Sequence, residues 1–176
     1  MSDILLKTAQ EQYPILRDVP FNYKYNPSGG DGFLEFWPAD ESGTPDRPRP
    51  AEFPPGQVGV EVYNPNTRPI DILGDVVSHH LVKTDPTLKG FYDAFKGSLT
   101  QGQKSILQRQ YFAAQKEYGE ERNFYDWLDS SGLPAYFRGY VFNQWDRPEE
   151  LYTQPQMQQF DQMMTYLKQP PKKAVK

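Results

Sequence analysis

The chain has 176 residues, no cysteine and a formal net charge of -4 at pH 7. Without cysteine it has no disulfide, zinc ribbon, iron–sulfur cluster or catalytic thiol, and its acidic balance argues against a general nucleic-acid binder, which usually shows a basic face. Contact with nucleic acid is expected only through the lysine-bearing tail Lys168–Lys176, whose alternative interpretation is a solvated terminus.

The hydropathy pattern predicts a soluble protein made in a cytoplasm. No apolar run approaches the ~18 residues of a membrane span. The start of the chain, Met1–Pro14, carries acidic residues and only a short apolar patch, which is not the pattern of a signal peptide. Aromatic residues make up 15% of the chain while aliphatic residues are sparse, so we expect a core built largely from rings.

The first third of the chain predicts an arm followed by two strands. Prolines interrupt residues 1–31, which we interpret as an N-terminal arm. Alternating side chains predict strands over Gly32–Ala39 and Val58–Pro65. The proline-rich segment Glu41–Gly56 between them predicts an extended, exposed connection, because proline is excluded from helices and central strands. The two strands are expected to pair as an antiparallel ribbon lying on helices.

Residues 67–146 show helical periodicity. Asp85 with Pro86 predicts one helix start, Thr100 with Gln103 forms a capping box at another, and Gly119 predicts the end of that helix. Short apolar repeats follow at 124–128 and 133–145. The predicted fold is therefore α+β and mainly helical, with a two-stranded antiparallel β-ribbon packed on about five helices, Pro-rich arms, and a globular core over residues 32–146.

Residues 147–176 predict a C-terminal helix followed by the basic tail. Its apolar residues recur as a narrow stripe among glutamines, and methionine adapts well to irregular surfaces. The stripe has two interpretations, closing the core or docking on a protein partner. Its members are Met157, Phe160, Met164 and Leu167.

The chain's two histidines, His79 and His80, are adjacent and so point in different directions on a helix. The spacing that shares a ligand is i and i+4, which places Asp71, Asp75 and His79 on one face, with Glu61 of the preceding strand as a further ligand. Two carboxylates suit Mg²⁺ or Mn²⁺, and an added imidazole suits Zn²⁺. These residues are the catalytic and metal candidates of a small metal-dependent hydrolase, and no other cofactor is expected.

A structural interpretation of the same residues stays open. Carboxylates in the first half of a helix stabilise its dipole, which accounts for Asp71 and Asp75 without a metal. Lys83 follows His79 by one turn, as on a solvated charged face. His80 lies beside the apolar stripe, where a buried, hydrogen-bonded imidazole is the commoner outcome.

The segments GDVVSHHLV (74–82) and NFYDWLDSSGLPAYFRGYVFNQW (123–145), with the proline-rich connection, resemble uncharacterised proteins of tailed bacteriophages and prophages. The resemblance spans most of residues 32–146 and implies a context, synthesis in a host bacterial cytoplasm and a place in the virion, but carries no activity. We therefore expect a non-enzymatic structural or interaction protein that binds virion subunits, other protein partners or further copies of itself through its arms and C-terminal helix. The alternatives are the metal-dependent hydrolase and an inhibitor of a host protein.

Overall fold

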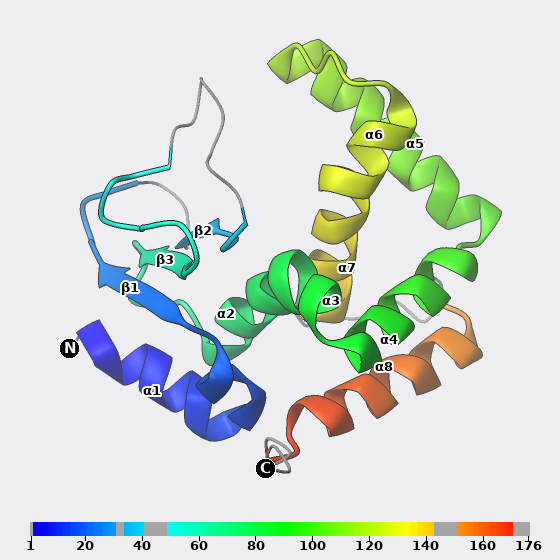
Figure 1. The fold of residues 1–176 in the computed structure, drawn as a ribbon. Coiled ribbons are helices and arrows are strands. Elements are labelled where there is room, and N and C mark those ends of the chain that lie inside the picture. The colour runs from blue at the N-terminus through cyan, green and yellow to red at the C-terminus, as the bar shows by residue number, and fades with distance from the viewer. Residues whose placement is uncertain (1, 31–33, 41–48, 143–150, 171–176) are drawn as a thin grey trace. The chain divides into compact units, whose positions relative to one another are not determined.

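The computed structural model describes residues 2–30, 34–40, 49–142 and 151–170. The chain divides into two compact units, one formed by Met1–Val76 with Met164–Lys176 and the other by Val77–Met163. This grouping differs from the arm, core and tail expected from the sequence. Each unit is described by itself, and Figure 1 labels the elements of both.

The first unit contains a three-stranded sheet of order β1-β3-β2, with β1 at Phe21–Tyr25, β2 at Leu34–Trp37 and β3 at Val58–Val62. The predicted antiparallel pairing of the second and third strands is confirmed. The sheet has three strands rather than the expected two, because β1 pairs in parallel with the other edge of β3. Its sequence FNYKY is short and flanked by prolines, and a parallel partner distant in sequence leaves no local signal.

The segment 1–31, expected to be an arm, supplies helix α1 (Ser2–Gln12), the 3-10 turn η1 (Pro14–Asp18) and strand β1. Helix α1 contacts both β1 and α2 (Pro69–Val76). The central strand is buried along its whole length, and its three valines form one apolar face. The N-terminal segment is therefore part of the sheet's core rather than a free extension.

The described part of the proline-rich connection folds back on the sheet. The Arg49 guanidinium donates to the carbonyl oxygens of Pro38 at 2.5 Å and Gln57 at 2.6 Å, and also to that of Phe53. The Phe53 ring stacks on Trp37 with ring centroids 4.9 Å apart and is 1% exposed. The expectation of an exposed connection holds for most of this part, since Ala51, Glu52 and Pro54–Gly56 are exposed, while Arg49 and the buried Phe53 ring hold the connection to the sheet. Residues 41–48 lie outside the described part of the chain.

The second unit is helical and confirms the capping signals. Asp85 accepts from the backbone N–H groups of Thr87 and Leu88, Thr100 and Gln103 form the complete capping box, and Gly119 ends its helix at a φ of 66°. The helices are interrupted by two π-helical segments, η2 and η3. The elements of this unit, in chain order, are η2 (Val77–Leu81), α3 (Val82–Thr84), α4 (Pro86–Gly97), α5 (Gln101–Tyr118), α6 (Phe124–Trp127), η3 (Leu128–Gly132), α7 (Leu133–Val141) and α8 (Gln154–Leu167, from Gln154 to Met163 in this unit).

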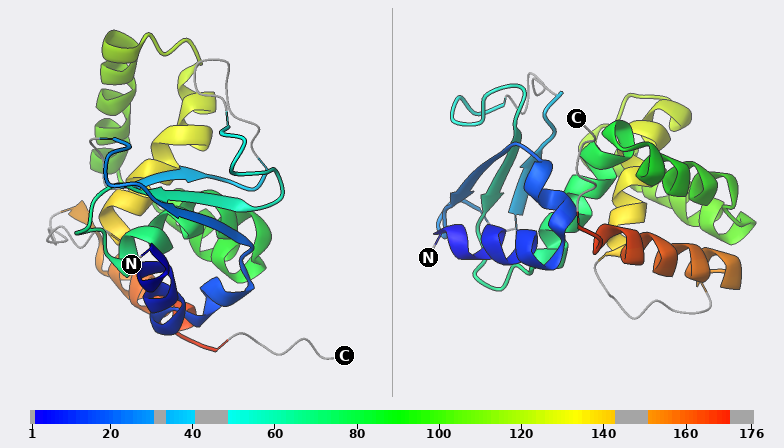
Figure 2. Two further views of the ribbon diagram at one scale, coloured as in Figure 1. Left: turned by 90° about the vertical axis from the view of Figure 1, so that its left-hand side faces the viewer. Right: turned by 60° about the horizontal axis from the view of Figure 1, so that its bottom comes forward.

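Aromatic rings build the core of the helical unit, as the composition predicts. Phe95 of α4 lies with its ring centroid 5.3 Å from Phe137 of α7 and 5.5 Å from Phe160 of α8. Tyr136 and Tyr152 extend the cluster. Helices α4 and α8 consequently lie side by side (Figure 2).

Helix α8 opens with a second capping box that mirrors the first. Thr153 and Gln156 exchange side-chain and backbone hydrogen bonds, as Thr100 and Gln103 do at α5. The two glutamine amides then pair with each other, and both are 1% exposed. The starts of α5 and α8 are therefore joined by one buried hydrogen-bond network, which also holds the carbonyl oxygen of Leu151.

The predicted C-terminal stripe is largely buried. Phe160 and Leu167 are 1% and 0% exposed, while Met157 and Met164 are half-buried. The buried face also includes Met163, which the prediction left out. This favours the core interpretation of the stripe over the docking interpretation. Within the described residues, no helix combines the length and apolarity needed to cross a bilayer.

Candidate interaction surface

The predicted metal constellation is not assembled. Among the described residues, no three His, Asp or Glu side chains gather in a group that could hold a metal ion. Asp71 accepts from the backbone and guanidinium of Arg68, its cap partner. The helix also changes from α to π at Val77, so the i,i+4 spacing that linked Asp75 to His79 does not hold at that point. Asp75 itself is buried, at 3% exposed.

His79 lies in the π-helix η2 and is largely withdrawn from water. Burial, followed by the positive charges of Arg138 and Lys83, lowers its pKa from 6.5 to about 4. The imidazole is therefore neutral at pH 7. The structural interpretation placed Asp75 and His79 on a solvated charged face, and this is wrong because Asp75 is buried and His79 is largely buried. His80, expected to be buried, is half-buried.

Glu61 belongs to a polar network on the sheet rather than to the helix. Its side chain accepts from Asn26 at 2.8 Å and from the Tyr63 hydroxyl at 3.3 Å, and its oxygen lies 3.3 Å from the Lys24 ammonium. Glu35 lies directly opposite on β2. Burial and the two carboxylates raise the pKa of Tyr63, so its hydroxyl remains a donor to them. Lys24 and the Tyr63 hydroxyl thus offset part of the repulsion between two carboxylates that lie directly opposite each other on neighbouring strands.

Exposed aromatic side chains lie toward the C-terminal end of α5. The core-facing stripe of this helix begins with Gln103, Leu107 and Tyr111, which are 1%, 1% and 8% exposed. Two turns beyond Tyr111, at the same face, Tyr118 is 83% exposed. The stripe of α5 therefore extends beyond the part of the helix that other elements of the unit cover.

Two more rings beside this end of α5 are exposed. Phe112 is 63% exposed, and Tyr125 of α6 is 75% exposed. They are linked through Tyr111 and Phe124, with successive ring centroids 5.4–5.7 Å apart. We call the exposed rings Phe112, Tyr118 and Tyr125, with the half-buried Phe124, the aromatic tip.

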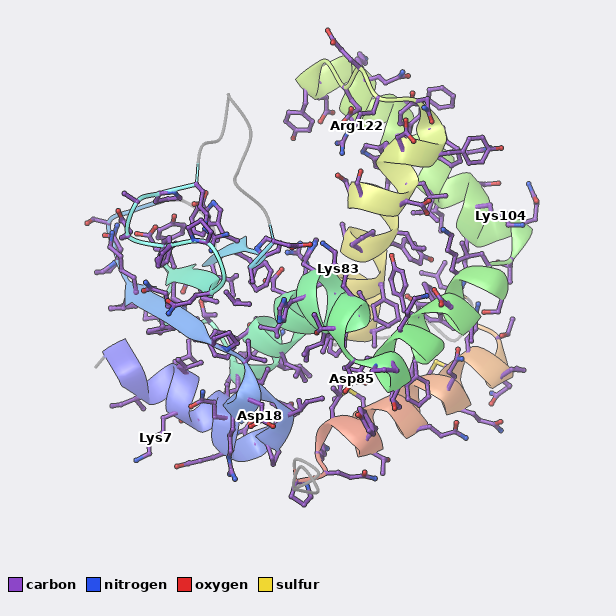
Figure 3. The ribbon with its side chains drawn as sticks, viewed as in Figure 1. Lys7, Asp18, Lys83, Asp85, Lys104 and Arg122 are labelled. Atoms are coloured by element: carbon purple, nitrogen blue, oxygen red, sulfur yellow. The ribbon has the colours of Figure 1, made fainter. Side chains whose placement is uncertain are left out.

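Arg122 braces the turn that joins α5 to α6. Its guanidinium pairs with the Glu120 carboxylate and donates to Ser130 at 2.7 Å and Ser131 at 3.0 Å, while its carbonyl oxygen accepts from Tyr111. In Figure 3, Arg122 lies at the end where α5 turns into α6, and Lys104 marks the opposite end of α5. Arg122 holds the pKa of Glu120 down at about 2. The turn between Tyr118 of α5 and Tyr125 of α6 is therefore held by charge-assisted hydrogen bonds.

Asn123 and Trp127 complete the support of the tip. The Asn123 side chain accepts from two backbone N–H groups at the start of α6. The Trp127 ring packs against Gly132, where a Cβ atom would lie 2.3–2.7 Å from the ring. Large apolar rings on a rigid support, exposed to solvent, are typical of protein-binding sites, because little conformational entropy is lost on binding.

The charges around the tip are mainly negative. Glu117, Glu121 and Asp126 are exposed, and no ion pair between described residues involves them. On α5, Phe112 instead has Arg109 and Lys116 one turn away on either side. The surface therefore has an acidic end at the two tyrosines and a basic border at Phe112.

A groove of about 380 Å³ runs between α4 and the start of α8. Its walls offer uncharged hydrogen-bonding groups and a few apolar side chains, without a titratable group. The lining residues are Phe91, Ala94, Ser98, Pro155, Gln156, Gln158, Gln159 and Gln162. The groove could hold a neutral polar segment, but it carries no group for acid–base or metal chemistry.

The sequence patterns did not identify the aromatic tip. Tyr118 continues a core stripe by spacing, and burial depends on whether another element covers that turn. The acid-rich stretch 117–129 predicts only a helix start. One signal was present, since Gly119 ends the helix directly after Tyr118 and so places the ring at a terminus.

Comparison with protein-family models, with curated proteins and with solved structures gives no match for this chain.

Proposed function

We propose that this chain is a protein-interaction component that docks on its partner through the aromatic tip. The observation that carries the proposal is the exposure of Phe112 and Tyr118 on α5 and of Tyr125 on α6, the two helices joined by the turn that Arg122 braces. Aromatic residues are enriched among the side chains that dominate binding energy at interfaces. A preformed surface of this kind suits recognition of another macromolecule better than turnover of a small substrate.

The biological context of the proposal comes from the resemblance of residues 74–82 and 123–145 to proteins of tailed bacteriophages and prophages. The second of these segments contains α6 and η3, which form part of the tip and its support. A virion subunit and a host protein are both partners that a phage protein could bind. The proposal is that either class is engaged through the same rings.

The test compares a triple variant of the aromatic tip with a control variant at an exposed apolar residue of the other unit. Tagged wild-type chain, a Phe112→Ser, Tyr118→Ser, Tyr125→Ser variant, and an Ile4→Ser control are used to purify proteins from phage-infected bacteria. Ile4 is 63% exposed, as Phe112 is, but lies in α1 of the other unit. We expect a partner that is retained by wild type and control and lost with the triple variant.

The purified partner then gives a quantitative readout. Loss of three interface aromatics is expected to weaken binding at least ~30-fold, equivalent to ~2 kcal/mol for one strong hot spot. Equal affinity of the triple variant and wild type for every recovered protein would show that the tip is not the docking site. Circular dichroism of the variants verifies that the helices are intact.

A further inference from the structure

We infer that the partner segment seated on the aromatic tip is basic, with Arg or Lys side chains over the two tyrosines; this inference rests on the proposed function. The carboxylates of Glu117 and Glu121 flank the tip and take part in no ion pair between described residues. The only carboxylate of the turn with a cationic partner among the described ion pairs is Glu120, which Arg122 holds. The negative charge at the tip is therefore open to a ligand.

The exposed rings and the carboxylates favour the same kind of group. A guanidinium or ammonium group is attracted to the face of an aromatic ring. A guanidinium also forms paired hydrogen bonds with a carboxylate, and these are stronger than bonds between neutral groups. Glu117 and Tyr118 belong to the last turn of α5, and Tyr125 and Asp126 belong to the single turn of α6, so each exposed phenol shares a helical turn with an acid.

The basic border at Phe112 sets the orientation of the segment. Arg109 and Lys116 lie within one turn of Phe112 on α5, so a second cation there would be repelled. An apolar side chain is the better match for the Phe112 ring. The segment that fits places its basic residues at Tyr118 and Tyr125 and an apolar residue at Phe112. A polyanion such as nucleic acid is excluded from the acidic end by the same charges.

The experiment measures binding of two labelled peptides by fluorescence anisotropy at low salt. One peptide repeats Arg-Gly-Leu and the other repeats Glu-Gly-Leu, so that they differ only in the sign of their charge. We expect the full chain to bind the arginine peptide and not the glutamate peptide. Added salt is expected to weaken the binding, because exposed charges are screened.

Matched charge variants distinguish peptide binding at the aromatic tip from attraction to the negative net charge of the whole chain. Glu117→Gln with Glu121→Gln is compared with Glu11→Gln plus Asp18→Asn, which changes the net charge equally on the other unit. We expect the tip variant to raise the Kd of the arginine peptide at least fivefold and the control to change it less than twofold. Equal effects of the two variants, or equal binding of the two peptides, would overturn the inference.

The same variants distinguish failure of this inference from failure of the proposed function. If the natural partner is lost with the serine triple variant but unaffected by Glu117→Gln and Glu121→Gln, the tip is a docking site and its partner segment is not basic. If neither variant affects any partner, the proposed function itself fails.

Discussion

The side-chain amides of Gln103 and Gln156 form a reciprocal pair, with Gln103 Nε2 3.0 Å from Gln156 Oε1 and Gln156 Nε2 3.1 Å from Gln103 Oε1. Each glutamine also closes the capping box of its own helix. The two residues are 53 positions apart in the sequence. One buried pair therefore satisfies the orphan donors of two helix starts and fixes those starts against each other.

Gln103→Ala is expected to lower the free energy of unfolding by about 2–3 kcal/mol, because it removes the capping bond to the Thr100 N–H and the hydrogen bonds to Gln156 and to the Leu151 carbonyl. The exposed neighbour Gln101 is the control, and its alanine variant is expected to stay within ~0.5 kcal/mol of wild type. Urea unfolding measures both. The double variant Gln103→Ala, Gln156→Ala should cost less than the two single changes added together, since each single change already removes the hydrogen bonds that join the two amides. Full additivity would contradict the pairing.

Gly132→Ala tests the support beneath the tip. A Cβ atom at this position would overlap the Trp127 ring, so we expect a loss of about 1–3 kcal/mol in stability. Gly139, in α7, has no neighbouring atom within 4 Å of the Cβ position and is the matched control. Gly139→Ala should be neutral or stabilise the chain by up to ~1 kcal/mol through helix propensity. If thermal unfolding shows the two variants to be alike, the close packing of Trp127 on Gly132 is wrong.

His79 predicts a dependence of stability on pH. Its pKa is lowered to about 4 in the folded chain, so between pH 4 and 6.5 the unfolded chain binds the proton and the folded chain does not. The stability that this group contributes is complete above pH 6.5 and is lost as the pH falls toward 4. The steepest slope is about 1.4 kcal/mol per pH unit.

Unfolding measured across this pH range checks the prediction. His79→Gln is expected to flatten the dependence between pH 4 and 6.5, because glutamine does not titrate. Direct titration of the His79 ring by NMR provides the second readout. A His79 pKa at or above 6.5 in the folded chain would contradict the burial of this side chain.

The features of the fold that could be predicted from the sequence are those whose signals lie in neighbouring residues of the chain. Asp85, Thr100 and Gly119 act on the residues next to them in the chain, and all three helix boundaries are confirmed. The pairing of β1 with β3 joins Tyr23 to Val60, and no local pattern specifies a partner at that separation. Local signals therefore predicted helix ends better than sheet topology.

The candidate site was harder to predict for the same reason. Helical spacing placed Tyr118 on the stripe of Tyr111, which is correct as geometry, but the spacing does not show where the covering element ends. The proposed ligand set around His79 assumed a regular α-helix, and the π-helical turn at Val77–Leu81 changes the spacing there. In both cases the deciding information lay in tertiary packing.

Tyr118 and Tyr111 should differ sharply in their contribution to stability. Tyr118→Ser removes a ring that is 83% exposed and is expected to change the free energy of unfolding by less than ~0.5 kcal/mol. Tyr111→Ser removes a buried ring and its hydrogen bond to the Arg122 carbonyl, with an expected loss of about 3–5 kcal/mol. Urea unfolding compares the two. A large loss of stability in Tyr118→Ser would mean that this ring supports the fold, and the case for a binding role would fail.

The most direct test of the docking surface is site-specific photo-crosslinking in cells that produce the full chain during phage infection. A photoreactive phenylalanine analogue replaces Tyr125 in one variant and Ile4 in a second, so that two exposed positions, one on each unit, are compared. We expect one protein partner to be crosslinked from position 125 and not from position 4. Crosslinks that are the same from both positions, or a partner captured only from position 4, would contradict the assignment of the aromatic tip as the binding surface.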